Sequence, residues 1–451
     1  MACLKFTQPT DWDAIEAHLA GGRGERFAFA HTRQLATTGQ GPVVEVVGVD
    51  LINQHDVVSD RSGWYLADAA LDRVHNAAVT GGHGLVEFHN HHLGPPAFSP
   101  TDEDGLTPMA DYVTGAMPDR PYGAGVYAAG RVHVEYWCRT ADGLQRGRFR
   151  SVTVLGDHLR VLNAPPNRDI DRLARQAALL GKWGSATLTS LRVAVVGAGG
   201  TGSHAALALA YLGVGDVLVL DDDHAEATNL NRLVTAGHAD IGAPKNLVAR
   251  RRMREIDPRL RVTALPALSP VGAHPELHDV DLIIGCVDHD GPRDRLNQIA
   301  VDTATPYIDL ATGIDTTTSP PTVGGRAVLV IPGGPCLHCL SELDPAEISR
   351  WAKTPEQQAL DRAHGYGTPE PNPAVVHLNG IAVHAALSEL VAWVSGHRPP
   401  AQYLDVDLSG VLARADSPPG CRVAPRRPAR PVSGCICCSH RHAGACTAGQ
   451  E

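Results

Sequence analysis

The pattern of apolar and polar positions changes near residue 165, and the two sides of this point predict different elements. Before it, short apolar stretches predict strands at 43–49, 84–88, 125–129, 132–137 and 149–154. After it, apolar strands alternate with helical patterns, which is the βαβ order of a parallel sheet. We therefore expect an α/β chain with two domains, 1–165 and 166–440, and a disordered tail at 441–451.

Composition narrows the class of protein. Of the 451 residues, 43% are hydrophobic, as in globular proteins, and the net charge of −10 argues against a nucleic-acid-binding surface. No run approaches the roughly 18 apolar residues of a membrane span. The first residues also lack the apolar run of a signal peptide. We expect a cytoplasmic chain that binds neither nucleic acid nor membrane.

A candidate metal site follows the apolar stretch 84–88. His89 and His91 continue this stretch, and alternate residues of a strand share a face, so one metal can take both side chains. Ser99 followed by Pro100 is typical of a helix start, and Asp102 in the first turn can return as a third ligand. Three protein ligands leave one position open for water, which predicts a catalytic zinc and a hydrolase.

The spacing His-x-His-x7-Ser-x2-Asp resembles the JAB/JAMM metallopeptidases, which cleave after the C-terminal glycine of ubiquitin-like proteins. The resemblance implies a mixed α/β domain, with Glu25 as general base on the zinc-bound water and Ser99 at the oxyanion. Glu45 is the competing candidate for the base, and His92 is interpreted as a neighbour without a role. The alternative interpretation is a simple helix cap beside polar surface histidines.

A second site follows the apolar strand 191–196. Gly197, Gly199, Gly200 and Gly202 form a turn before a helix that we expect to run from 203 to 212, and such a turn binds phosphate through free backbone N–H groups. Asp221 comes after the next strand, where an acid can bind ribose hydroxyls. These features alone would also fit an NAD-dependent oxidoreductase.

Further motifs change that interpretation. Asp221-x-Asp223, Asn229-Leu-x-Arg232, Gly-x-x-Lys245 and a late Asp288 resemble the ThiF/MoeB/ubiquitin-activating superfamily. The resemblance implies a Rossmann-like domain that uses ATP and Mg²⁺ to adenylate the C-terminal glycine of small β-grasp proteins. By position, Arg232 and Lys245 would bind phosphates, Asn229 would orient the phosphate chain, Asp288 would bind magnesium and Asp221 ribose. The alternatives are surface charges and, for Asp288, a turn at the end of a strand.

Upstream, the stretch 172–176 resembles the family's Arg-Tyr-x-Arg-Gln helix, although Leu173 replaces the tyrosine. By this resemblance Arg175 would reach the γ-phosphate in a partner subunit, which implies a homodimer. A salt bridge on the helix surface is the alternative role for Arg175.

Paired cysteines predict a third site. Cys336 and Cys339 form one Cys-x-x-Cys knuckle and Cys435 and Cys438 a second, as in a structural zinc site with four thiolates, although Cys437 could replace one ligand. Between 340 and 420 there is no cysteine that could form a thioester, and Cys286 ends a buried strand. The adenylate would then pass directly to an acceptor or to a separate conjugating or sulfur-donating protein.

Together these patterns predict a bifunctional enzyme. One half would adenylate a ubiquitin-like or sulfur-carrier protein ending in Gly-Gly, and the other would cut after that glycine, to trim a precursor or to reverse a conjugation. The alternatives are a non-catalytic adaptor that binds a β-grasp protein and the oxidoreductase named above.

Overall fold

The computed structural model describes residues 2–21, 24–39, 41–60, 63–92, 94–165, 171–270, 272, 274–354, 356–357, 373–409, 422–425 and 430–442. The chain forms two compact units, Met1–Pro166 and Asn167–Glu451.

The first unit is built on a nine-stranded mixed sheet of order β11-β10-β1-β3-β2-β6-β7-β8-β9. Its strands overlap all five stretches predicted before residue 165. They are β1 (Cys3–Phe6), β2 (Phe27–Thr38), β3 (Gly41–Leu51), β6 (Gly84–Asn90), β7 (Tyr122–Ala128), β8 (Arg131–Thr140), β9 (Gly143–Arg148), β10 (Ser151–Leu155) and β11 (Leu159–Val161). A separate hairpin is formed by β4 (Val57–Asp60) and β5 (Gly63–Leu66), after the 3-10 turn η1 (Gln54–Asp56).

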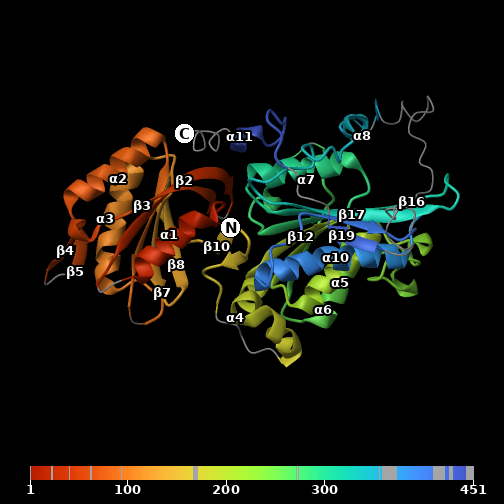
Figure 1. The fold of residues 1–451 in the computed structure, drawn as a ribbon, viewed down its shortest axis with the longest axis horizontal. Coiled ribbons are helices and arrows are strands. Elements are labelled where there is room, and N and C mark those ends of the chain that lie inside the picture. The colour runs from red at the N-terminus through yellow and green to blue at the C-terminus, as the bar shows by residue number, and fades with distance from the viewer. Residues whose placement is uncertain are drawn as a thin grey trace, which may run out of the picture. The chain divides into compact units, whose positions relative to one another are not determined.

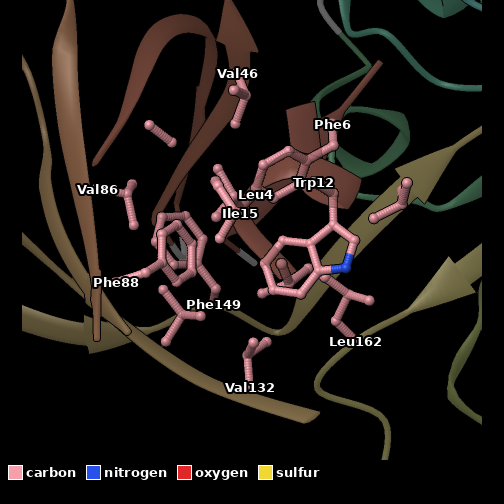
Figure 2. Close-up of a cluster of buried hydrophobic side chains, with 14 of the residues drawn as sticks. Leu4, Phe6, Trp12, Ile15, Val46, Val86, Phe88, Val132, Phe149 and Leu162 are labelled. Carbon is pink, nitrogen blue, oxygen red and sulfur yellow. The ribbon is translucent and has the colours of Figure 1, made fainter. Parts of the chain in front are cut away.

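Three helices cover this sheet, α1 (Pro9–Ala20) on one face and α2 (Asp68–Gly81) and α3 (Pro100–Ala116) on the other (Figure 1). Strand alternation divides the core accordingly. Ala28 and Ala30 of β2 pack in the α1 core, whereas Phe29 packs with α2 and α3. Figure 2 shows the α1 core, in which Trp12 packs edge-on against Phe6 and Phe88.

The second unit contains an eight-stranded sheet of order β14-β13-β12-β15-β16-β17-β18-β19. Five neighbouring strands are parallel, as the alternating pattern predicts: β12 (Arg192–Val196), β13 (Asp216–Leu220), β14 (Arg261–Leu265), β15 (Leu282–Gly285) and β16 (Tyr307–Asp315). Three antiparallel strands, which the pattern did not predict, extend the sheet: β17 (Thr322–Val330), β18 (Tyr403–Asp407) and β19 (Arg422–Pro425).

Helices cover both faces of this sheet (Figure 1). One face carries α4 (Ala174–Ser190), α5 (Gly200–Leu212), α6 (Lys245–Ile256) and α10 (Val376–Ser395), and the other carries α7 (Asp290–Asp302) and α8 (Pro345–Trp351). Short 3-10 turns are η2 (Asp171–Leu173), η3 (Ala227–Asn229), η4 (His238–Asp240) and η5 (Pro275–Leu277). The predicted tail begins inside α11 (Ser439–His442), and residues 443–451 lie outside the described residues.

Helix α10 is the one helix in the described ranges that is long and apolar enough to cross a membrane. Of its most apolar window, 67% is buried within the protein, and α10 packs against α4, α5 and β17. A core helix passes the same test of length and composition, so packing against the sheet accounts for this apolar stretch.

Candidate functional site

His89 at the end of strand β6 and His91 just after it lie on the side of the sheet that α3 covers. Val86 and Phe88 pack in the α1 core, and Leu85 packs with α2 and α3. Because side chains alternate along a strand, His89 lies on the Leu85 side. His91 follows just beyond β6, where its backbone N–H donates to the carbonyl of Tyr127 at 2.9 Å.

Helix α3 brings Asp102 to these histidines. As the sequence predicts, Ser99 is the N-cap and Pro100 is the first helical residue; Ser99 and Asp102 also form a capping box. The backbone N–H of Asp102 donates to Ser99 Oγ at 3.2 Å, and that of Ser99 donates to Asp102 Oδ2 at 2.6 Å. The Ser99 hydroxyl accepts in this box and also lies within hydrogen-bonding reach of the Asp102 carboxylate.

The distances within this group match a tetrahedral metal site. The Nε2 atoms of His89 and His91 lie 3.3 Å apart, and they lie 3.5 Å and 3.4 Å from the two carboxylate oxygens of Asp102. With zinc–ligand bonds of about 2.0–2.2 Å, tetrahedral geometry separates ligand atoms by roughly 3.3–3.6 Å. His89, His91 and Asp102 could therefore hold a zinc ion.

The pKa values of Asp102 and Glu25 are shifted in opposite directions. Burial alone would raise the pKa of Asp102, but hydrogen bonding and charge from His89, with hydrogen bonds from Ser99, lower it far below the ordinary range. Burial raises the pKa of Glu25, an effect that the nearby His89 opposes. Asp102 is therefore held as a carboxylate, whereas Glu25 takes up a proton more readily than an exposed glutamate.

Strand register places Glu25, and not Glu45, near the histidines. Phe27 of β2 pairs with His89 of β6, and Glu25 lies two residues before Phe27, close enough for the charges of His89 and Asp102 to act on its carboxylate. Glu45 pairs with Arg33, six residues further along β2, and its carboxylate accepts bonds from Arg33 at 2.7 Å and from Thr7 at 2.8 Å.

The glycine turn between β12 and α5 requires glycine at two positions. Gly197 has a φ of +91°, which favours glycine, and a Cβ there would lie 2.5 Å from the carbonyl oxygen of Cys286. A Cβ on Gly202 would lie 1.8 Å from the carbonyl oxygen of Gly197. Glycine therefore allows the first turn of α5 to approach the strand closely. Gly202 itself is not among the residues that line the cavity at this turn, which is described next.

A cavity of about 500 Å³ opens at this turn. Most of the predicted nucleotide residues line it: Gly197, Gly199, Gly200, Asp221, Asp223, Arg232, Lys245 and Asp288. The ammonium of Lys245 lies 2.8 Å from Asp223 Oδ2, and Arg232 donates to the carbonyl of Thr228 at 3.1 Å. Two cations thus stand beside the N-terminus of α5, an arrangement that attracts anions.

The carboxylate of Asp221 stabilises the glycine turn by hydrogen bonds. It accepts the backbone N–H of Ala198 at 2.6 Å and that of Asp223 at 2.9 Å. Burial raises the pKa of Asp221, which these hydrogen bonds partly offset. Asp221 therefore has a structural role that its position after a strand did not predict.

Two predicted residues lie outside the cavity. Asn229 caps η3 by accepting the backbone N–H of Glu226 at 3.2 Å. Arg175 is exposed at the start of α4, next to Arg172, which donates to the carbonyls of Ala210 and Tyr211 at the end of α5. The cavity is at the opposite end of α5, a helix of 13 residues or about 20 Å.

The cavity also contains side chains that the sequence analysis did not single out: Thr201, Ala267, Leu268, Thr312, Trp351 and Asn379. The only signal for Asn379 is a buried polar residue in the apolar helix α10.

Four cysteines form a second candidate metal site. The Sγ atom of Cys336 lies 3.8 Å from that of Cys339 and 3.6 Å from that of Cys435, and Cys339 and Cys438 are 3.4 Å apart. Tetrahedral zinc with bonds of about 2.3 Å to sulfur separates its ligands by about 3.8 Å. The four thiols, which are those predicted, could thus bind zinc.

Helix α7 holds this cluster. His338, inside the first knuckle, bonds through Nε2 to Asp294 at 2.6 Å. Asn297 accepts the backbone N–H of Leu337 at 3.0 Å and donates to Cys437 Sγ at 3.1 Å. Hydrogen bonding, first from Cys437, lowers the pKa of Cys336 to about 4, which favours the thiolate that binds metals.

Cys286 lines the nucleotide cavity. Burial raises its pKa to about 12, so at neutral pH it is a thiol and a poor nucleophile. This agrees with the expectation of an unreactive residue at the end of a buried strand.

Comparison with known proteins identifies the second unit. The profile of the ThiF family matches residues 173–418, more than half of the chain. The sulfur carrier protein ThiS adenylyltransferase of Escherichia coli is 31% identical over 179 residues, which cover 39% of this chain and 68% of the relative. The sulfur carrier protein adenylyltransferase of Thermus thermophilus is 34% identical over 184 residues, which cover 39% of this chain and 66% of the relative.

Other similar proteins extend this set. The SAMP-activating enzyme E1 of Haloferax volcanii is 32% identical over 174 residues, covering 38% of this chain and 62% of the enzyme, so the match spans less than two thirds of that relative. Among solved structures, E. coli MccB with AMPCPP and MccA aligns with 60% of this chain and 75% of its own, at 19% identity and a TM-score of 0.44.

Proposed function

The chain belongs to the ThiF family, and on that basis we propose that its second unit adenylates the C-terminal glycine of a ubiquitin-like or sulfur-carrier protein with ATP. The observation that carries the proposal is the cavity at the start of α5, where Arg232, Lys245 and Asp288 stand around the glycine turn. The sulfur-carrier adenylyltransferases among the relatives support the choice of substrate.

The reaction requires two anions to meet. A carboxylate oxygen of the glycine bonds to the α-phosphorus of ATP, the bond from that phosphorus to the bridging oxygen breaks, and pyrophosphate leaves. Lys245, Arg232 and the backbone N–H groups of α5 offset the negative charge that gathers in this step. Asp288 would hold Mg²⁺, which neutralises phosphate charge when bound.

Arg175 would complete this site in a second copy of the chain. It lies next to residues that contact the far end of α5, about one helix length from its own cavity, so it cannot reach its own nucleotide. We therefore propose a homodimer in which Arg175 binds the γ-phosphate in the partner subunit.

The product would leave without a thioester on this chain. Cys286 is buried with its pKa at about 12, and no cysteine occurs between residues 340 and 420. We propose transfer of the acyl group to an acceptor or to a separate conjugating or sulfur-donating protein. The four-cysteine cluster would bind a structural zinc.

For the first unit we propose a JAB/JAMM-type metallopeptidase that cuts after the same glycine. The support is the triad of His89, His91 and Asp102, whose ligand atoms lie close enough together to share a zinc ion. A zinc ion there would activate a water molecule for hydrolysis. Glu25 would accept the proton from that water, and the Ser99 hydroxyl would donate to the oxyanion.

Two assays test the halves separately. With ATP, radiolabelled pyrophosphate and a carrier ending in Gly-Gly, we expect label to exchange into ATP, and its absence with every carrier encoded nearby would exclude adenylation. With a carrier extended beyond Gly-Gly, we expect zinc-dependent release of the extension. A metal-loaded protein inactive in both assays would support the adaptor, and tight NADH binding the oxidoreductase.

A further inference from the structure

One polar side chain of α10 reaches the phosphate-binding turn. Asn379 is 3% exposed, and its neighbours Leu378, Ala382 and Val383 on the same helix are buried apolar residues. Asparagine in such a helix is unfavourable unless its amide is satisfied. The position of Asn379 therefore needs a polar partner.

Thr312 of β16 supplies half of that requirement. Its hydroxyl donates to Asn379 Oδ1 at 3.1 Å, which turns Nδ2 the other way. Within the described part of the chain, Nδ2 has no protein acceptor. Both Thr312 and Asn379 line the nucleotide cavity.

The free amide faces the start of α5. A Cβ built on Gly200, the first residue of that helix, would lie 2.2 Å from Asn379 Nδ2 and 3.4 Å from Cδ of Arg232. Asn379 and Arg232 thus flank the same glycine. An anion that binds to the first N–H groups of α5 would meet the amide of Asn379 directly.

We infer that Asn379 binds the nucleotide phosphates, most directly the α-phosphate at the N-terminus of α5, and that Thr312 orients its amide for this purpose. The inference rests on the proposed adenylation. It adds a neutral donor from α10 to the two cations on the other side of the phosphate chain. It also explains why Gly200 has no side chain, since a methyl group there would displace the amide.

The test uses the full-length protein and measures ATP affinity by calorimetry and the KM for ATP in pyrophosphate exchange. Asn379→Asp keeps the shape and the acceptor for Thr312 but turns an anionic oxygen toward the phosphate. Hydrogen bonds to charged groups are strong enough that we expect ATP affinity to fall roughly 10- to 100-fold. Asn379→Ala should give a smaller loss in the same direction.

Thr312 provides an independent check. Thr312→Val should weaken ATP binding several-fold, whereas Thr312→Ser, which retains the hydroxyl, should recover most of the affinity that Thr312→Val loses. Asn53→Asp, an exposed substitution in the first unit, is the control for added charge. Unchanged thermal unfolding of each variant separates binding from folding.

The outcomes are distinguishable. If the wild type binds ATP but Asn379→Asp and Asn379→Ala bind it equally well, the role of Asn379 is wrong and the adenylation proposal stands. If the Asn379 variants raise the KM for the carrier but leave ATP affinity unchanged, the proposed role of Asn379 is likewise wrong. If the wild type binds no ATP, the proposed function itself fails.

Discussion

The Nε2 atom of His92 lies 2.8 Å from the carbonyl oxygen of Gly24, the residue that precedes Glu25. On the other side of Glu25, the backbone N–H of Arg26 donates to Asn90 Oδ1 at 2.7 Å. Asn90 and His92 alternate with the proposed ligands His89 and His91. The segment that would hold the metal therefore also fixes the backbone on both sides of the proposed base.

Replacing His92 should slow hydrolysis without loss of metal. A misplaced catalytic group typically costs up to about 100-fold, so we expect His92→Ala to lower kcat for extension release roughly 10-fold or more. His92→Gln retains a donor for the Gly24 carbonyl and should recover most of the rate. Zinc content by mass spectrometry should be unchanged in both; a rate equal to that of the wild type in His92→Ala would show that this contact does not matter.

Asp102 and Ser99 should separate metal binding from helix capping. Asp102→Asn can still accept the N–H of Ser99, so stability should change little, but loss of the carboxylate should remove the zinc of the first unit. Ser99→Ala removes a cap, which costs about 0.5–2 kcal/mol, and should keep that zinc. The checks are zinc stoichiometry and denaturant unfolding, and zinc retained by Asp102→Asn would contradict the assignment.

Cys286 should resist alkylation at neutral pH. With its pKa raised to about 12 by burial, the reactive thiolate is rare below that value and rises about tenfold per pH unit toward it. Peptide mapping after brief iodoacetamide treatment at pH 7 should find Cys286 unmodified, and Cys286→Ser should keep pyrophosphate exchange. Rapid labelling near pH 7 would instead reveal a reactive thiol.

Two inactive variants should complement each other if Arg175 acts in the partner subunit. Arg175→Ala and Asp288→Asn should each lack pyrophosphate exchange. Random reassociation of an equal mixture makes about half of the dimers mixed, each with one intact site, so about a quarter of the wild-type activity should return. No recovery after confirmed subunit exchange would place Arg175 outside the reaction.

Trp12 should dominate the stability of the first unit. It is fully buried between Phe6 and Phe88, so Trp12→Ala should lower the free energy of unfolding by about 3–5 kcal/mol. Trp64, which is 41% exposed, offers a matched control, and Trp64→Ala should cost much less. Denaturant unfolding followed by fluorescence measures both.

Features that depend only on residues close together in the chain could be predicted from the sequence. Alternation along a strand was enough to place His89 and His91 on one face, and the Ser-Pro order was enough to predict the helix start. Local patterns could not choose between Glu25 and Glu45, because they do not show which of the two lies near the histidines. The pairing of Phe27 with His89, set by long-range register, separates them.

The remaining surprises also come from long-range packing. Thr312 and Asn379 are 67 residues apart and meet only because α10 packs on the sheet. Asn229 matches a motif, yet its side chain caps η3 instead of lining the cavity. A motif fixes the residue type at a position, whereas the direction of its side chain depends on elements that the motif does not contain.

Helix α7 begins two residues after Asp288, and its later turns hold the four-cysteine cluster through Asp294 and Asn297. Helix α7 therefore joins the residue that we propose to bind magnesium to the four cysteines. When zinc is scarce and the four cysteines bind none, the part of α7 that contacts them should be held less firmly. If both proposed activities hold, we expect zinc depletion to abolish adenylation together with hydrolysis, although zinc takes no part in the chemistry of adenylation.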